Sequence, residues 1–295
     1  MKQLLILSGK GGTGKTTIAG AFIKLSAAKA YADCDVDAPN LHLIMDQNSE
    51  PGRRDFYGLP KAEINRELCI KCDRCIQNCR FEAILMNEEY LIDAFTCEGC
   101  GVCEAVCPVG AVALKPAAAG ELMLYLDEGK IFSTAQLKMG SGTSGMLVTE
   151  VKKQMRSAAE DAELAIIDGS PGIGCPVIAS LSGVDMVLIV AEPSISGISD
   201  MQRIIKTAEV FRTKAAVCIN KYDTNPANSE MIEKLCRAGN LPFVGRIPFD
   251  PEAVKAINDG LTVVDVDCPS GIAVREVFNK TIKLLFDAST IAADI

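Results

Sequence analysis

Short apolar runs that alternate with helically spaced segments dominate this chain of 295 residues. Residues 3–8 are largely apolar and lead through a glycine-rich loop into residues 18–28, where apolar positions recur with the period of a helix. Further apolar runs at 164–167, 187–191 and 216–219 are each followed by a polar turn and a second helical pattern. Strands that alternate with helices predict an α/β fold with a mostly parallel sheet flanked by helices.

The alternation is interrupted in the middle of the chain. There, residues 83–94 predict a short hairpin, and residues 121–136 predict a second hairpin that returns the chain to the sheet. Gly and Pro residues indicate hinges at 52–60 and 116–120. We therefore predict a discontinuous domain, residues 1–60 and 117–295, that encloses a small separate domain of residues 61–116.

Composition and charge narrow the function classes. With 48% apolar and 23% charged residues the chain is ordinary for a globular protein, which excludes a disordered or collagen-like chain. The net charge of −8 argues against a nucleic-acid partner, because phosphate neutralisation needs clustered Lys and Arg. We predict a cytoplasmic protein because neither a signal peptide nor an apolar run of transmembrane length is found. A membrane partner is not expected either, because the tail at 287–295 lacks basic residues.

Thirteen cysteines are the unusual feature of the composition. In a cytosolic chain such a density favours metal or redox chemistry over disulfides. Eight of the thirteen lie in two runs that share one spacing, with gaps of two, two and three residues. The first run is Cys69, Cys72, Cys75 and Cys79, and the second is Cys97, Cys100, Cys103 and Cys107, followed by Pro108.

This spacing resembles that of bacterial two-cluster ferredoxins, in which the fourth cysteine of each run ligates the other cluster. The resemblance implies two [4Fe-4S] clusters in an inserted α+β ferredoxin domain. Arg80 departs from the pattern, because it follows Cys79 where the family usually has Pro. Two zinc sites are the alternative for soft thiolate ligands, but they do not need four-cysteine runs of this form. The implied ligands are Cys69, Cys72, Cys75 and Cys107 for cluster one, and Cys79, Cys97, Cys100 and Cys103 for cluster two.

A Walker A pattern occupies the turn after the first predicted strand: Gly9, four residues, Gly14, Lys15 and Thr16. Glycines let backbone N–H groups surround phosphates, and the helix that follows presents its positive dipole end. We expect Lys15 to contact β- and γ-phosphate oxygens and Thr16 to ligate Mg²⁺. The predicted ATP- or ADP-binding residues of this loop are Gly11, Gly12, Thr13, Gly14, Lys15, Thr16 and Thr17.

Lys10 makes the loop similar to the deviant Walker A of the MinD/ParA/Mrp/nitrogenase-iron-protein superfamily of P-loop ATPases. There the earlier lysine reaches the partner's phosphates in a nucleotide-sandwich dimer. Asp35 and Asn40 match that superfamily's switch I, in which the Asp orients the attacking water and the Asn lies near the nucleotide. Asp168, at the end of an apolar run, matches Walker B, and Gly172 matches the γ-phosphate sensor of switch II. On the adenine side the resemblance implies Asn220, Pro248 and Asp250, and Asp223 has either a base contact or a turn role.

The combined pattern predicts an Mg-ATP-dependent ATPase that carries two [4Fe-4S] clusters and works as a homodimer or as a heterodimer with a paralogue. Two purposes remain open: ATP-gated electron transfer, or a MinD/ParA/Mrp-like role in positioning or metallocofactor assembly. An acidic cluster-bearing segment implies a redox or metalloprotein partner with a basic docking face. A cobyrinate a,c-diamide synthase would need a glutaminase Cys-His pair, and the single histidine, His42, is expected to be a packed structural residue.

Five cysteines lie outside the two runs. Cys218 and Cys34 are expected to be buried fillers at strands. Cys175 follows Asp168 by seven residues, an offset that resembles the bridging-cluster cysteine of nitrogenase iron protein, so a third cluster shared across a dimer stays an alternative. The Gly/Ser-rich residues 140–145 precede a predicted helix, and they either bind an anion or partner or form a flexible capped loop.

Overall fold

A large twisted sheet forms the framework of the protein in the computed structural model, which describes residues 1–45, 47–127 and 129–287. Within these residues the sheet has nine strands in the order β13-β12-β11-β1-β10-β2-β9-β8-β3. The first seven of them in this order run parallel to one another, as predicted. They are β13 (Phe243–Ile247), β12 (Lys214–Asn220), β11 (Met186–Ala191), β1 (Lys2–Leu7), β10 (Leu164–Asp168), β2 (Ala30–Asp33) and β9 (Lys130–Leu137).

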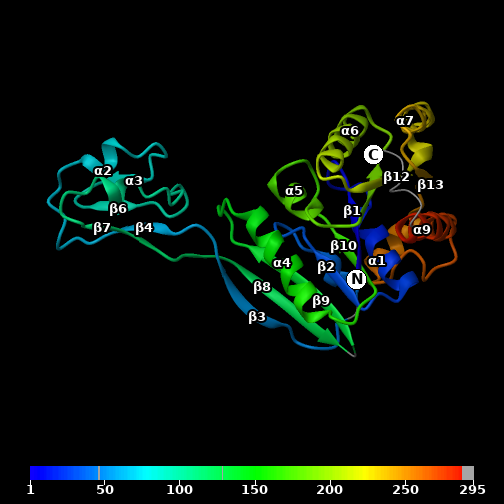
Figure 1. Ribbon diagram of the computed structural model, residues 1–295, viewed down its shortest axis with the longest axis horizontal. Coiled ribbons are helices and arrows are strands. Elements are labelled where there is room, and N and C mark those ends of the chain that lie inside the picture. The colour runs from blue at the N-terminus through cyan, green and yellow to red at the C-terminus, as the bar shows by residue number, and fades with distance from the viewer. Residues whose placement is uncertain (46, 128, 288–295) are drawn as a thin grey trace.

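Helices cover both faces of this sheet (Figure 1). Leu5 and Leu7 of β1 point to one apolar cluster, and Leu4 and Ile6 point to the other. This arrangement is typical of a parallel strand that is buried on both faces, and it explains the continuous apolar run at 3–8. The first cluster includes residues of α4 (Ser144–Ala158), α5 (Cys175–Leu181), α6 (Ile195–Val210) and α7 (Pro226–Ala238), and the second includes residues of α1 (Lys15–Ser26) and α9 (Pro269–Phe286), with α8 (Pro251–Asn258) packed against it.

The cysteine-rich segment (residues 61–116) lies apart from the large sheet (Figure 1). Its strands β4 (Lys61–Ile64) and β7 (Val112–Lys115) pair antiparallel, and the predicted hairpin is observed as β5 (Ile84–Met86) and β6 (Tyr90–Ile92). Two one-turn helices complete it, α2 (Arg74–Gln77) and α3 (Val102–Ala105). A small apolar cluster of its own, which contains Ala62, Ala83, Cys97 and Val112, holds these elements together.

The predicted hinges are wrong over most of their length. Residues of the first hinge form β3 (Gly52–Tyr57), which pairs antiparallel with β8 (Ala118–Asp127), and β8 in turn pairs antiparallel with β9. The physical reason is long-range pairing: β8 supplies backbone partners to β3, and Phe56 is buried against the core. Residues 58–60 and 116–117 are left as the connections between the sheet and the cysteine-rich segment.

His42 also differs from its expectation. It is exposed, in a 3₁₀ turn (Leu41–Leu43), because Leu41 and Ile44 occupy the inward positions of this segment. Among the residues described, no helix combines the length and apolar character that a membrane crossing requires. The prediction that the tail at 287–295 does not bind a membrane concerns residues that lie, apart from residue 287, outside the described part of the chain.

Candidate functional site

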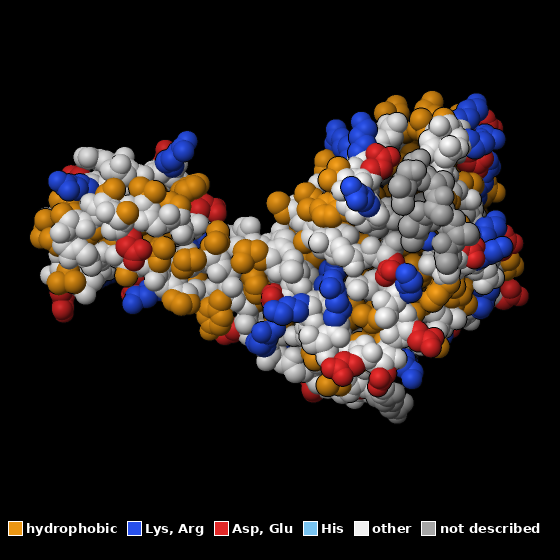
Figure 2. All heavy atoms as spheres, viewed as in Figure 1, with side chains coloured by type: hydrophobic (Ala, Val, Ile, Leu, Met, Phe, Trp, Pro, Cys, Tyr) orange, Lys and Arg blue, Asp and Glu red, His pale blue; other side chains and the backbone are white. Residues whose placement is uncertain are grey.

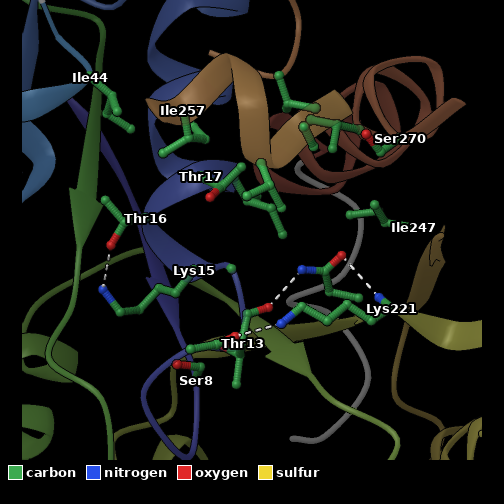
Figure 3. A pocket seen from close by; sticks show the side chains of 18 of the residues that line it. Ser8, Thr13, Lys15, Thr16, Thr17, Ile44, Lys221, Ile247, Ile257 and Ser270 are labelled. Carbon is green, nitrogen blue, oxygen red and sulfur yellow. Dashed lines mark hydrogen bonds between the residues drawn. The ribbon is translucent and has the colours of Figure 1, made fainter. Parts of the chain in front are cut away.

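The predicted phosphate loop connects the end of β1 to the start of α1, as the sequence pattern required. Gly14 has a φ of +89°, and a Cβ atom built on it would lie 2.3 Å from Nδ2 of Asn220. Only glycine fits both conditions without strain. The Asn220 amide donates to the carbonyl of Thr13 at 2.7 Å, and Lys221 Nζ donates to the carbonyl of Gly12 at 2.8 Å (Figure 3). The loop is therefore fastened to the end of β12.

Lys15 and Thr16 meet the predicted Walker B residue. Lys15 Nζ lies 2.6 Å from Oδ1 of Asp168, and the Thr16 hydroxyl donates to Oδ2 at 2.7 Å. Parallel pairing of β1 with β10 brings the two strand ends together. Burial alone would lower the pKa of Lys15, but the charge of Asp168 raises it above its ordinary value. Three groups expected to handle phosphate and Mg²⁺ are thus in contact.

Asp33 is a residue of this site that the sequence reasoning missed. Its side chain is buried at the end of β2, and it accepts hydrogen bonds from the backbone N–H groups of Asp35 (2.9 Å), Asn40 (3.0 Å) and Leu41 (2.9 Å). Burial, together with the nearby charge of Asp168, raises the pKa of Asp33 to about 7. The carboxylate fixes the shape of switch I. Its signal in the sequence was its place at a strand end two residues before Asp35.

A cavity of about 800 Å³ opens beside the phosphate loop (Figure 3). Its lining contains predicted residues of the phosphate loop, of switch I and of the adenine side, which are far apart in the sequence. Asp35 lines it and is partly buried, and that burial raises its pKa. Among the predicted residues that line it are Lys10, Gly11, Gly12, Thr13, Gly14, Lys15, Thr16, Thr17, Asp35, Asn40, Asn220, Pro248 and Asp250. Sequence reasoning missed Ile44, Ala253, Val254 and Ile257, which form an apolar wall with Ile247 of the predicted adenine-side loop, and it assigned no role to Lys221.

Three predicted residues make hydrogen bonds that hold the loops around the site. Asp250 accepts from the backbone N–H of Glu252 at 3.0 Å as the N-cap of α8, and from that of Ser270 at 3.1 Å. The backbone N–H of Gly172 donates to the carbonyl of Ser8 at 3.1 Å, which links switch II to the phosphate loop. Asp223 accepts from the backbone N–H of Phe249 at 2.8 Å, and this bond joins two loops that are 26 residues apart in the chain rather than closing a local turn.

Lys10 is held within its own chain. Its Nζ lies 2.7 Å from Oε2 of Glu192 and donates to the Ser194 hydroxyl at 3.2 Å. Both partners follow the end of β11, so this lysine sits at the rim of the cavity, where the predicted contact with a second chain stays a prediction.

The cysteine-rich segment gathers its eight cysteines in two groups. One cavity is lined by Cys69, Cys72, Cys75 and Cys107, and a second by Cys79, Cys97, Cys100 and Cys103. Each group thus takes its fourth cysteine from the other run. Among the described residues, no three His, Cys, Asp or Glu side chains surround a position suited to one metal ion.

Of the other cysteines, Cys34 and Cys218 are fully buried, and burial raises the pKa of each thiol to about 12. Both therefore act as apolar side chains in the core. Cys175 is different, because it is exposed at the first position of α5, directly after switch II. Cys175 lines neither of the two cysteine cavities.

A glycine loop between a buried strand and a helix, facing a carboxylate on the next parallel strand, defines a P-loop nucleotide-binding protein. Residues 4–263 match the family described as the CobQ/CobB/MinD/ParA nucleotide binding domain, and the chain belongs to this family. It is 32% identical over 290 residues to an uncharacterized protein of Methanocaldococcus jannaschii. This match covers 94% of this chain and 95% of the other.

Two further similarities concern proteins whose names state a role. An iron-sulfur cluster carrier protein of Pyrococcus horikoshii is 23% identical, over 96% of this chain and 86% of its own. The solved structure of the septum site-determining protein MinD complexed with Mg-ADP, from Pyrococcus horikoshii, superposes with a TM-score of 0.57 at 17% identity, over 96% of each chain. This likeness shows the MinD/ParA fold.

Proposed function

We propose that this protein is an Mg-ATP-dependent ATPase switch that carries two [4Fe-4S] clusters in residues 61–116. The observation that carries the proposal is the presence, in one chain, of a phosphate loop whose Lys15 and Thr16 meet Asp168 and of two separate groups of four cysteines. Membership of the nucleotide-binding family supports the first part. Residues 1–60 and 117–295 then form the ATPase domain.

The residues of the phosphate loop have distinct roles in this proposal. Backbone N–H groups of residues 11–17 and the Lys15 ammonium bind the phosphates, and the Thr16 hydroxyl holds Mg²⁺, which offsets the phosphate charge. Asp35 lines the same cavity and orients the attacking water. Lys10 leaves Glu192 and reaches the nucleotide of the partner when two chains, or this chain and a paralogue, dimerise around nucleotide. The apolar wall with Ile247 and Ile257 packs on the adenine.

The two cysteine groups fit [4Fe-4S] clusters by number and by surroundings. A cubane takes four thiolates on four different iron atoms, so its ligands surround a cavity rather than a single point. Cys107 also accepts from the backbone N–H of Ala111 at 3.2 Å. Although burial acts to raise the pKa of Cys107, hydrogen bonds from backbone N–H groups, that of Val109 first, lower it overall. This favours the thiolate that a cluster needs.

For the purpose of the clusters we favour ATP-gated electron transfer to a redox or metalloprotein partner. Between residues 61 and 115 there are six basic and nine acidic side chains, and each oxidised cubane with four thiolates adds about two negative charges. A partner with a basic face complements this surface. Among the alternatives, the similarity to an iron-sulfur cluster carrier protein favours a role in cluster assembly, with the clusters as cargo or as regulatory groups.

Anaerobic purification followed by iron analysis and an ATPase assay tests the proposal. We expect about eight iron atoms per chain, which is four for each cluster, and Mg²⁺-dependent ATP hydrolysis. About ten would instead indicate a further cubane that two Cys175 side chains share in a dimer. Zinc in place of iron would contradict the cluster assignment, and hydrolysis unaffected by Lys15→Ala would contradict the ATPase assignment.

A further inference from the structure

The glycine-rich residues 140–145 lie between the cysteine-rich segment and switch II. On one side, a Cβ atom built on Gly140 would lie 3.0 Å from Cδ1 of Phe95, and one built on Gly142 would lie 3.6 Å from Oε2 of Glu98. Phe95 and Glu98 flank Cys97, a member of the second cysteine group. Gly140 has a φ of +77°, so a side chain there would be strained as well as crowded by the ring.

The other side of the same loop contacts the start of α5. A Cβ atom built on Gly145 would lie 3.2 Å from the carbonyl oxygen of Cys175 and 3.3 Å from its Cβ. Cys175 opens the helix that follows the switch II residues 168–172. The loop therefore lies directly against the first residue of the helix that follows switch II.

Helices α4 and α5 are also fastened at the opposite end. Lys152 of α4 donates from its Nζ to the carbonyl oxygens of Ala179 (3.1 Å), Ser180 (2.6 Å) and Ser182 (2.6 Å) at the end of α5. Residues of α4 thus contact both ends of α5, with Gly145 at its start and Lys152 at its end. Helix α4 itself begins at the loop that touches Phe95.

The second cysteine group also contacts the connection to the ATPase domain. A Cβ atom built on Gly99 would lie 2.1 Å from the carbonyl oxygen of Pro60, and Lys61, the first residue of the cysteine-rich segment, donates from its Nζ to the carbonyl of Cys97. Gly58, in the same connection, packs on Thr143, where a built Cβ would lie 2.7 Å from Oγ1. Residues near the second group thus meet both the connection and the glycine-rich loop.

We propose that residues 140–145 couple switch II to the second cysteine group through the contact of Gly140 with Phe95. The first group, which includes Cys69 and Cys72, is not reached by this route. This contact covers only a small part of the ring, because Phe95 is still 73% exposed. Met139, the residue before Gly140, is 93% exposed. Figure 2 shows the hollow between the cysteine-rich segment and the ATPase body that leaves room for movement. This inference rests on the proposed function, since it needs both nucleotide and clusters.

Hydrogen-exchange mass spectrometry on the cluster-loaded full chain, with and without a non-hydrolysable Mg-ATP analogue, tests the coupling. In the wild-type protein we expect nucleotide to change exchange in residues 9–17, in switch II and in residues 93–103, with a much smaller change in 66–78. Phe95→Ala should keep the response of 9–17 and switch II and lose more than half of the response of 93–103. Leu85→Ala is the matched control, because it removes an exposed apolar side chain of the same segment, and it should keep every response.

Gly145→Ala tests the contact between the glycine-rich loop and Cys175. It also replaces Phe95→Ala as the test variant if Phe95→Ala loses its iron. The added methyl group crowds Cys175, so the response of 93–103 should again fall by more than half while 9–17 still responds. Full retention of the 93–103 response in both variants would overturn the coupling. So would a wild-type protein in which 9–17 and switch II respond but 93–103 does not. No response in 9–17, or no iron, would overturn the proposed function itself, and this inference with it.

Discussion

The carboxylates of Asp33 and Asp168 lie at the ends of neighbouring parallel strands but have different partners. Asp168 pairs with Lys15 and Thr16, whereas Asp33 accepts only backbone N–H groups among the hydrogen bonds described for it. The register of β2 with β10 places the two residues opposite each other. Asp33 therefore holds the backbone of switch I, whereas Asp168 contacts the phosphate loop. A motif identifies Asp168 from sequence alone, but only the pairing of the strands reveals Asp33.

The raised pKa of Asp33 predicts a pH dependence of stability. Its pKa is about 7 in the folded chain and 3.8 for the free side chain, so the folded state keeps a proton that the unfolded state releases between these values. The stability this group contributes is present below about pH 4 and is lost as the pH rises through 7. Asp33→Asn removes this titration. Urea unfolding between pH 5 and pH 8 should show a steeper loss of stability in the wild-type protein, and parallel curves would contradict the assignment.

The two lysines of the phosphate loop should separate binding from hydrolysis. Lys15→Ala leaves Asp168 without its cation and removes the phosphate contact, so we expect ATP affinity to fall at least tenfold. Lys10→Ala removes a partly exposed ion pair worth at most about 1 kcal/mol, so folding and ATP affinity should change little. If Lys10 acts across a dimer, hydrolysis should nevertheless fall at least tenfold. Calorimetry and a phosphate-release assay measure the two effects, and undiminished hydrolysis in Lys10→Ala would contradict its role.

At the scale of the secondary-structure elements, α4 holds α5, the helix that follows switch II. Lys152 is buried, and its three carbonyl partners belong to Ala179 and Ser180 in the last turn of α5 and to Ser182, which follows the helix. A helix end needs donors for its final carbonyl groups, and here one ammonium group supplies them. The short α5 is therefore stabilised by its neighbour more than by its own seven residues.

Lys152→Met should lower the free energy of unfolding by about 1–3 kcal/mol, because it leaves buried carbonyl groups without a donor. Lys153→Met is the matched control, since Lys153 is exposed and has only a 3.5 Å contact with Glu150. Denaturant unfolding monitored by circular dichroism measures both. Equal stability of the two variants would show that the three carbonyl contacts contribute nothing.

The crossing of the two cysteine runs predicts which substitutions resemble each other. Cys107→Ser should disturb the same cluster as Cys69→Ser, and Cys79→Ser the same cluster as Cys97→Ser, because each pair lines one cavity. Electron paramagnetic resonance of the reduced proteins distinguishes the two signals. A Cys107→Ser spectrum that matches Cys97→Ser would mean that each run holds its own cluster.

For the chain as a whole, local patterns predicted most of the fold. Burial on both faces made the parallel strands visible as apolar runs, and the phosphate loop has a fixed spacing. Features that depend on long-range pairing were not predictable. Residues 52–57 looked like a hinge because β8, their partner, lies more than 60 residues away. The contact of Phe95 with Gly140 could not be predicted either, because no sequence pattern indicates that these two residues lie together.

The central claim is that nucleotide and clusters influence each other within this molecule. Such coupling is reciprocal: if nucleotide binds the oxidised and reduced protein with different affinity, the reduction potential must shift on nucleotide binding. For a one-electron couple, a tenfold difference in affinity corresponds to about 59 mV.

An anaerobic redox titration of the clusters, with and without the non-hydrolysable Mg-ATP analogue, measures this shift directly. The account predicts that the potential of the cluster held by Cys79, Cys97, Cys100 and Cys103 changes when nucleotide binds, and that Lys15→Ala abolishes the change. Identical potentials with and without bound nucleotide would contradict it.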